Sequence, residues 1–141
     1  DLRCASMAAS FAVPEVTLGT ICGAGGTQRL PRLIGETRAK EMIFTGREIT
    51  AETARAWGLV NGVFTAGSLL EETLNLAEEI ARNSPYAVTC AKRSVNGGRE
   101  MLLEEALEWE RSLFGECGES RDRKEGMTAF LEKRPRVFTG E

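Results

Sequence analysis

A single carboxylate followed by a glycine cluster is the part of this sequence best suited to chemistry. Glu15 lies in the stretch FAVPEVTLGTICGAGGTQRLPR, residues 11–32, and is followed by Gly23, Gly25 and Gly26. A positioned carboxylate can donate or accept a proton. The free amides of a glycine turn at a helix start can hold a water molecule or a developing negative charge. The pairing therefore indicates a candidate site for acid–base chemistry.

The glycine cluster does not match the common nucleotide-binding motifs. Both the phosphate-loop pattern and the dinucleotide pattern fail at Gln28, and Arg29 follows it. Glycine clusters are also frequent in ordinary tight turns, so a structural turn beside a solvated Glu15 is the competing interpretation of these residues.

Composition excludes several other classes of site and protein. The chain has no histidine, which rules out Ser-His-Asp and Cys-His catalysis within it. Its four cysteines are scattered without a CxxC pair, so we expect reduced thiols and no metal site. A net charge of -3 argues against general nucleic-acid binding. No apolar run approaches the roughly 18 residues that a membrane span requires.

The elements that position the carboxylate are predicted to be a short strand, a turn and a helix. Pro14 favours an extended Val13, so we expect the strand to end near Glu15. After the glycine turn, Thr27 to Leu30 are predicted to be helical until Pro31 breaks the pattern.

Two further helices and a strand are predicted before residue 65. Gly35 separates the first helix from a second one that ends at Gly46. Thr50 is typical of an N-cap, and Gly58 is expected to close the helix that follows it. Residues 59–64 are predicted to form a short strand.

The remainder of the chain is predicted to consist of four helices. The first begins with a capping box of Ser68 and Glu71, the second with Ser84 and Pro85, the third at about residue 101, and the last near Ser120. The last helix must end before Pro135. The apolar residues expected to mark the inward sides of the first three helices are Leu69, Leu76 and Ile80, then Val88, Ala91 and Val95, then Leu103, Leu107 and Phe114.

The full string closely resembles the enoyl-CoA hydratase (crotonase) family. The resemblance runs through PEVTLGTICGAGGTQRLPRLIG, then AKEMIFTGREITAETARAWGLVNGVF, and later DRKEGMTAFLEKR. It implies an α/β fold of the crotonase-like spiral type, here mostly helical with a few short strands. It also implies one domain, with the end of the spiral core at about 1–65 and a helical trimerisation region at about 66–141.

The resemblance implies an enzyme that adds water reversibly to a trans-2-enoyl-CoA and gives a 3-hydroxyacyl-CoA. Glu15 matches the second of the family's two glutamates, the one assigned mainly to donating a proton at the α carbon. Gly23 matches the glycine whose amide helps to hold the attacking water. Cys22 stands where many relatives have proline, a departure expected to alter the turn only slightly.

Three residues near the C-terminus are implied to bind coenzyme A. Phe114 matches the aromatic residue at the adenine end, and Phe130 and Lys133 match residues of the C-terminal helix, commonly of a neighbouring subunit. From the residues alone, an aromatic ring and a lysine suit adenosine and its 3′-phosphate, but Lys133 and Arg134 also suit a helix C-terminus for structural reasons. The resemblance implies a homotrimer or hexamer and no cofactor, since coenzyme A is part of the substrate.

The family's first glutamate and both oxyanion-hole segments have no counterpart in these residues. One acid–base group is worth roughly 10²- to 10⁴-fold and each oxyanion donor about 10²- to 10³-fold in rate. We therefore expect this chain to be the C-terminal half of a hydratase, inactive without a missing or separate N-terminal half. The open alternatives are an enoyl-CoA isomerase, a hydratase for branched acyl chains, and a non-catalytic acyl-CoA-binding or assembly remnant. The bacterial cytoplasm is the expected compartment, with the mitochondrial matrix second.

Overall fold

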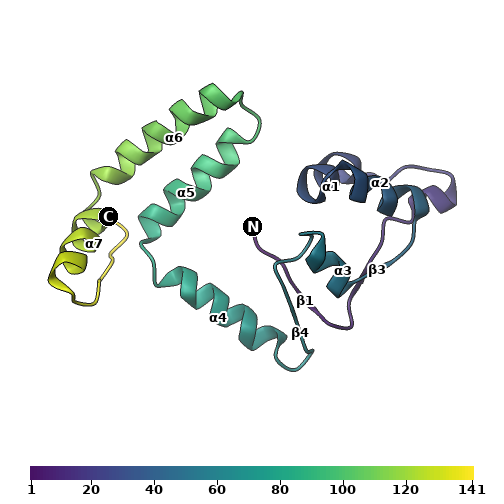
Figure 1. Cartoon of the computed structure of the whole chain (residues 1–141), viewed down its shortest axis with the longest axis horizontal. Coiled ribbons are helices and arrows are strands. Elements are labelled where there is room, and N and C mark those ends of the chain that lie inside the picture. Colours follow the sequence, from purple (N-terminus) through teal and green to yellow (C-terminus); the bar gives the residue numbers. More distant parts are fainter. The chain divides into compact units, whose positions relative to one another are not determined.

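A computed structural model describes residues 1–141, which form two compact units, 1–74 and 75–141. Figure 1 shows the elements along the chain. The first unit carries the short strands, and the second is helical apart from its loops and C-terminal tail. The expected assignment of residues 1–141 to a single domain stays a prediction.

Two small sheets organise the first unit. Strand β1 (Cys4–Ser6) pairs in parallel with β4 (Gly62–Phe64), and β2 (Ser10–Phe11) pairs antiparallel with β3 (Ile49–Thr50). Arg3 reinforces the first pairing, because its Nε donates a 2.6 Å hydrogen bond to the carbonyl of Leu59. These pairings bring the beginning and the end of the unit together.

Three helices and a 3-10 turn complete the first unit. They are η1 (Glu15–Leu18), α1 (Gly26–Ile34), α2 (Glu36–Thr45) and α3 (Ala51–Ala56). Gly35 and Gly46 end α1 and α2, and the Thr50 hydroxyl accepts from the Thr53 amide, as the sequence predicts. The core contains Ala5, Ile34, Ala39, Ala54, Leu59 and Val60.

Two local predictions in this unit are wrong. The strand before Glu15 ends at Phe11, because only two residue pairs face β3, and Glu15 instead opens η1. Helix α1 continues through Pro31 to Ile34. Proline removes one donor and strains the helix, but Leu30 and Ile34 pack into the core on either side of it.

Helix α4 (Leu69–Ala81) runs across the boundary between the two units. The Thr65 hydroxyl accepts from the Ser68 amide at its start, and this contact replaces the expected box of Ser68 with Glu71. None of its residues is buried, so the prediction that it lies on a core within this chain is wrong.

Helices α5 (Pro85–Gly98) and α6 (Leu103–Gly118) form an antiparallel hairpin in the second unit (Figure 1). Ser84 caps α5 and accepts from the Ala87 amide, as expected from the Ser-Pro pair. Arg93 joins the two helices through a 2.5 Å ion pair with Glu116 and lies over the ring of Trp109. The last helix, α7 (Arg121–Glu132), begins after Ser120 and ends before Pro135, as predicted.

The buried sides of α5 and α6 differ from those predicted. Cys90 and Leu113 are the buried residues of the two helices. Of the six residues expected to face inward on α5 and α6, Val88 is half-buried, whereas Ala91, Val95, Leu103, Leu107 and Phe114 are exposed. An apolar stripe indicates that a face can be buried, but the covering surface need not belong to the same chain.

Candidate active site

The backbone around Glu15 is fixed by a tight turn. The amide and the hydroxyl of Thr17 both donate to the carbonyl of Pro14, at 2.9 and 2.7 Å. The Thr20 amide donates to the carbonyl of Glu15 at 3.2 Å, and Gly19 closes the turn with a left-handed φ of 77°. This turn holds the Glu15 backbone without using its side chain.

The Glu15 carboxylate has no partner in the chain. Its side chain makes no hydrogen bond or ion pair, and its Oε2 atom is buried. Buried polar atoms are almost always hydrogen-bonded, so such an atom calls for an explanation such as a catalytic role or a bound group. The geometry leaves this carboxylate available for proton transfer.

The glycine turn leaves successive backbone amides without a partner in the chain. Ala24 and Gly25 have left-handed φ values of 51° and 83°, and the only bond that closes the turn runs from the Gly26 amide to the Gly23 carbonyl, 2.9 Å. The amides of residues 23–25 donate no hydrogen bond within the chain. Successive amides in such a turn favour an oxygen atom with negative charge.

Cys22 packs against Gly26 at the end of this turn. It is buried, and its Sγ lies only 3.0 Å from where a Cβ on Gly26 would stand. Gly26 therefore has to lack a side chain, and the thiol fills the space. Cys22 leaves the Gly23 amide without a partner, in agreement with the expectation from the sequence.

An apolar hollow lies between α1 and α2 in the same unit. It has a volume of about 560 Å³, and its lining includes Ile21 and Thr27, which lie on either side of the glycine turn. Its apolar lining consists of Val16, Ile21, Pro31, Ala39, Ile43 and Phe44. The first unit thus contains an unpaired carboxylate, a turn with free amides and an apolar hollow.

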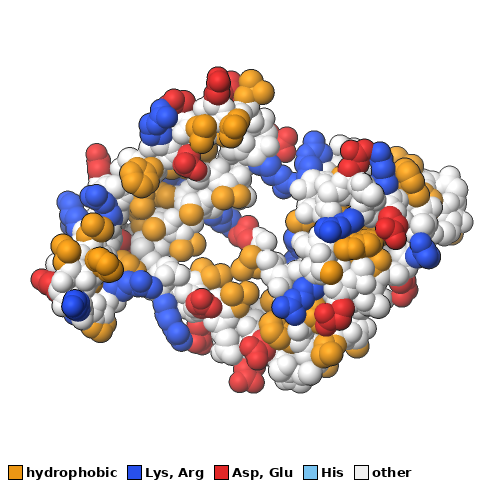
Figure 2. Space-filling view, viewed as in Figure 1, with side chains coloured by type: hydrophobic (Ala, Val, Ile, Leu, Met, Phe, Trp, Pro, Cys, Tyr) orange, Lys and Arg blue, Asp and Glu red, His pale blue; other side chains and the backbone are white.

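The other three predicted site residues lie in the second unit. Phe114 on α6 and Phe130 on α7 are 79% and 80% exposed. Lys133 follows α7 in a left-handed conformation, and its side chain makes no ion pair. Figure 2 shows further hydrophobic side chains at the surface of the α6 and α7 region. An exposed aromatic ring and a lysine are side chains that suit a ligand with a flat ring and a phosphate.

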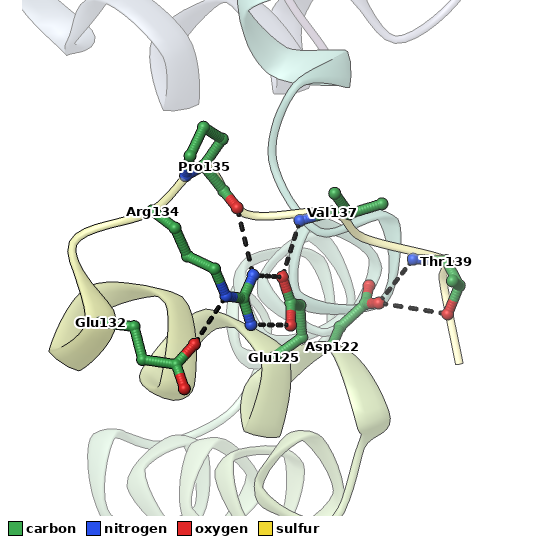
Figure 3. A network of polar contacts seen from close by, with 7 residues as sticks. All are labelled: Asp122, Glu125, Glu132, Arg134, Pro135, Val137 and Thr139. Carbon is green, nitrogen blue, oxygen red and sulfur yellow. Dashed lines mark hydrogen bonds and ion pairs between the residues drawn. The ribbon is translucent and has the colours of Figure 1, made fainter.

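A polar network that no sequence pattern predicted folds the C-terminal tail back onto α7 (Figure 3). Asp122 is buried and accepts from the Ser84 hydroxyl at 2.6 Å and from the amides of Thr139 and Gly140. Burial raises the pKa of Asp122, but the hydrogen bonds lower it by more than burial raises it. The pKa of Asp122 is therefore below its usual value. The only feature of the sequence that could have indicated this network is an aspartate, Asp122, two residues after Ser120 at a helix start.

Glu125 and Arg134 form the second part of this network. The Arg134 guanidinium binds both oxygens of Glu125, at 2.6 and 2.8 Å, and also Glu132. The hydrogen bonds from Arg134 and from the Val137 amide lower the pKa of Glu125 to about 2. The sequence suggested only an interaction of Arg134 with the helix dipole, since its partner lies nine residues earlier.

Comparison with known proteins relates the chain to enoyl-CoA hydratases. A family model described as enoyl-CoA hydratase/isomerase matches residues 1–141. The chain is 47% identical to the mitochondrial enoyl-CoA hydratase of Pongo abelii over 98% of its length, and 45% identical to the short-chain-enoyl-CoA hydratase of Clostridium acetobutylicum over 95%. A crystal structure of enoyl-CoA hydratase from Bacillus anthracis superimposes on all of the chain with a TM-score of 0.95 and 45% identity.

These matches cover only part of the relatives. The chain covers 48% of the Pongo abelii protein, 51% of the Clostridium acetobutylicum protein and 55% of the Bacillus anthracis chain. It thus spans about half the length of the relatives that it matches. The similarity establishes the crotonase-like α/β fold, of which these residues form a mostly helical portion.

Proposed function

Because this chain belongs to the enoyl-CoA hydratase/isomerase family, we propose that it supplies about half of an enoyl-CoA hydratase. The reaction adds water reversibly to a trans-2-enoyl-CoA and gives a 3-hydroxyacyl-CoA. The observation that carries the proposal is the unpaired carboxylate of Glu15, with its buried Oε2 atom, in the same unit as the free amides of residues 23–25.

Each residue has a distinct role in the proposed reaction. The oxygen of water forms a bond to the β carbon of the enoyl thioester while the carbon–carbon double bond opens. Glu15 donates a proton to the α carbon, and the attacking water, held by the Gly23 amide, loses one proton to the family's first glutamate. That glutamate belongs to the half of the fold that this chain does not cover. No cofactor is required, because coenzyme A enters and leaves as part of the substrate and product.

We assign binding of coenzyme A to the second unit. The exposed rings of Phe114 and Phe130 would contact adenosine, and Lys133 would contact the 3′-phosphate. The other partners are the N-terminal half of the fold and further copies of this chain, in a trimer or a hexamer. Uncovered apolar residues on α4 and α6 support such contacts, among them Leu70, Leu74, Leu103 and Leu107.

The names of the relatives bear on the compartment. None of the helices has the length and apolar character that a membrane span needs. The relatives include a mitochondrial protein and a bacterial one. Our proposal is the bacterial cytoplasm, with the mitochondrial matrix as the alternative.

The test is hydration of crotonyl-CoA by the chain combined with the part of the Bacillus anthracis enzyme that the chain does not cover. Loss of the enoyl-thioester absorbance reports turnover. We expect Glu15→Gln to lower kcat by roughly 10²- to 10⁴-fold, the value of one acid–base group, with little change in affinity for coenzyme A. The matched control is Glu52→Gln, an exposed glutamate on α3, which should retain wild-type turnover.

The competing functions give different results in the same assay. Full turnover by Glu15→Gln would contradict the proposed role. Conversion of a 3-enoyl-CoA without hydration would indicate an isomerase, an activity included in the description of the matched family. Binding of coenzyme A without any turnover by the combined wild-type protein would indicate a binding or assembly remnant.

A further inference from the structure

Lys133 has a backbone conformation that its residue type does not favour. Its φ and ψ are 55° and 37°, and Ala24 is the only other non-glycine residue of the chain with a positive φ. Glycine is the usual residue at this position after a helix, because a Cβ makes the left-handed region less favourable. Surrounding contacts must therefore hold Lys133 in place.

Those contacts are made by the next residue, Arg134. Its amide donates to the carbonyl of Ala129 at 3.0 Å, which turns the backbone back over the end of α7. Its guanidinium binds both oxygens of Glu125 and also donates to the carbonyl of Pro135 at 3.2 Å (Figure 3). The residue that follows Lys133 is thus held by a carboxylate of α7 and by a backbone carbonyl of the same helix.

The same arrangement leaves the Lys133 ammonium group without a partner. Glu132 is the adjacent acid, and its Oε2 accepts from Arg134 at 2.7 Å. Lys133 itself is exposed and makes no ion pair. Arg134 therefore engages the carboxylate that stands next to Lys133 in the chain, and the lysine charge stays available for a ligand.

The pair that holds the turn stays ionised over a wide pH range. Hydrogen bonds from Arg134 and from the Val137 amide lower the pKa of Glu125 to about 2, and the hydrogen bond to Glu125 raises the pKa of Arg134. Neither group changes its charge near neutral pH. The ion pair between Glu125 and Arg134 is therefore expected to persist near neutral pH.

We propose that Arg134, anchored by Glu125, is a positioning residue that fixes the turn at Lys133 and so directs the lysine ammonium to the 3′-phosphate of the coenzyme A thioester. This inference rests on the proposed function. It adds to that function a physical reason for phosphate recognition. A lysine on a flexible backbone would lose conformational entropy when it binds, whereas the backbone of a preset turn has already lost that entropy on folding.

The test compares coenzyme A with 3′-dephospho-coenzyme A as ligands, by calorimetry on the combined protein described above. Wild type should prefer coenzyme A by about tenfold, the value expected for one hydrogen bond to a charged group. Arg134→Ala should reduce this preference to that of Lys133→Ala and leave the affinity for the dephospho ligand unchanged. The double variant should lose no further preference.

Three more variants separate positioning from general damage. Arg121→Ala removes another ion pair between α7 and the tail, the one with Glu141, and should keep the preference. Lys133→Arg should also keep it, because the charge remains. Glu125→Gln releases Arg134 with little change in shape, and it carries the test if Arg134→Ala does not fold, as judged by circular dichroism.

The results separate a failure of the proposed function from a failure of the positioning role alone. Wild type that binds neither ligand overturns the proposed function and, with it, the positioning role. Wild type that binds both ligands equally overturns the contact of Lys133 with phosphate. The positioning role alone is overturned if Arg134→Ala and Glu125→Gln both keep the wild-type preference for coenzyme A. It is also overturned if these variants lose affinity equally for coenzyme A and 3′-dephospho-coenzyme A.

Discussion

Glu15 is a carboxylate whose backbone is held firmly while its side chain is left without a partner. The turn at Pro14, Thr17 and Gly19 uses only backbone groups and the threonine hydroxyl. Leaving a buried oxygen without a hydrogen bond costs about 1–3 kcal/mol. Evolved proteins tolerate such costs chiefly at functional sites. At the scale of single residues, this is the clearest mark of chemistry in the chain.

Gly46 is predicted to be essential for the position of Glu15. It ends α2 with a φ of 60°, and a Cβ there would lie 2.9 Å from Thr17 Cγ2 and 3.3 Å from Pro14 Cα. Gly46→Ala should therefore lower the free energy of unfolding by about 1–3 kcal/mol and displace the turn that carries Glu15. Urea denaturation measures the first effect, and hydration of crotonyl-CoA by the combined protein measures the second.

The control for this prediction is Gly58→Ala. Gly58 also has a positive φ, 81°, but a Cβ there would meet nothing within 4 Å. It should show the backbone strain without the displaced turn, and hence a loss of stability with little loss of turnover. Equal losses of turnover in the two variants would show that the contact of Gly46 with the turn is unimportant.

At the scale of elements, the α5–α6 hairpin depends on a close approach at one glycine. A Cβ on Gly97 would lie 2.6 Å from Nε1 of Trp109, and this nitrogen donates a hydrogen bond to the carbonyl of Arg93. Arg93 in turn pairs with Glu116. Gly97 lies in the last turn of α5, and its lack of a side chain lets the Trp109 indole pack against the helix.

Gly97→Ala is expected to destabilise the hairpin although alanine favours helices. The indole would have to move, which breaks its hydrogen bond, and overpacking of this kind costs about 1–3 kcal/mol. Gly115→Ala on α6 is the control, because a Cβ there meets nothing within 4 Å and should stabilise the helix by about 0.5–1 kcal/mol. Thermal unfolding followed by circular dichroism should therefore shift in opposite directions. A shift in the same direction would refute the close approach.

At the scale of the whole molecule, much apolar surface has no covering within the chain. Leu103, Leu107 and Phe114 form one stripe on α6 and are 74%, 47% and 79% exposed, and α4 has no buried residue. Monomeric proteins rarely expose contiguous apolar surface of this kind, and such surface commonly marks contacts with other chains. The proposed trimer and the other half of the fold are the partners that we expect to cover it.

Self-association of the chain should depend on the α6 stripe. We expect sedimentation velocity to detect oligomers, and Leu103→Lys combined with Leu107→Lys to shift them towards monomer, because each buried leucine contributes about 1.5–3 kcal/mol. Ser112→Lys, an exposed residue on the same helix, adds a charge outside the stripe and should leave the oligomers intact. A wild-type chain that stays monomeric at high concentration would contradict the prediction.

The sequence by itself determined the local features of the fold. The correct predictions include Gly35 between two helices, the helix end at Gly46, the caps at Thr50 and Ser84, and the start of the last helix near Ser120. These signals act within a few residues, because a cap or a left-handed glycine satisfies neighbouring backbone groups. Glu15 and the glycine turn were also identifiable, since their residue types and spacing carry the family resemblance.

Tertiary structure alone decided which surfaces are covered and which charged groups meet. The inward sides of α5 and α6 are at Cys90 and Leu113 rather than along the stripes predicted from apolar spacing. The contact of Arg134 with Glu125 and the strained turn at Lys133 depend on reversal of the tail. Burial and ion pairing depend on groups that folding brings close from distant positions, and no local pattern specifies that proximity.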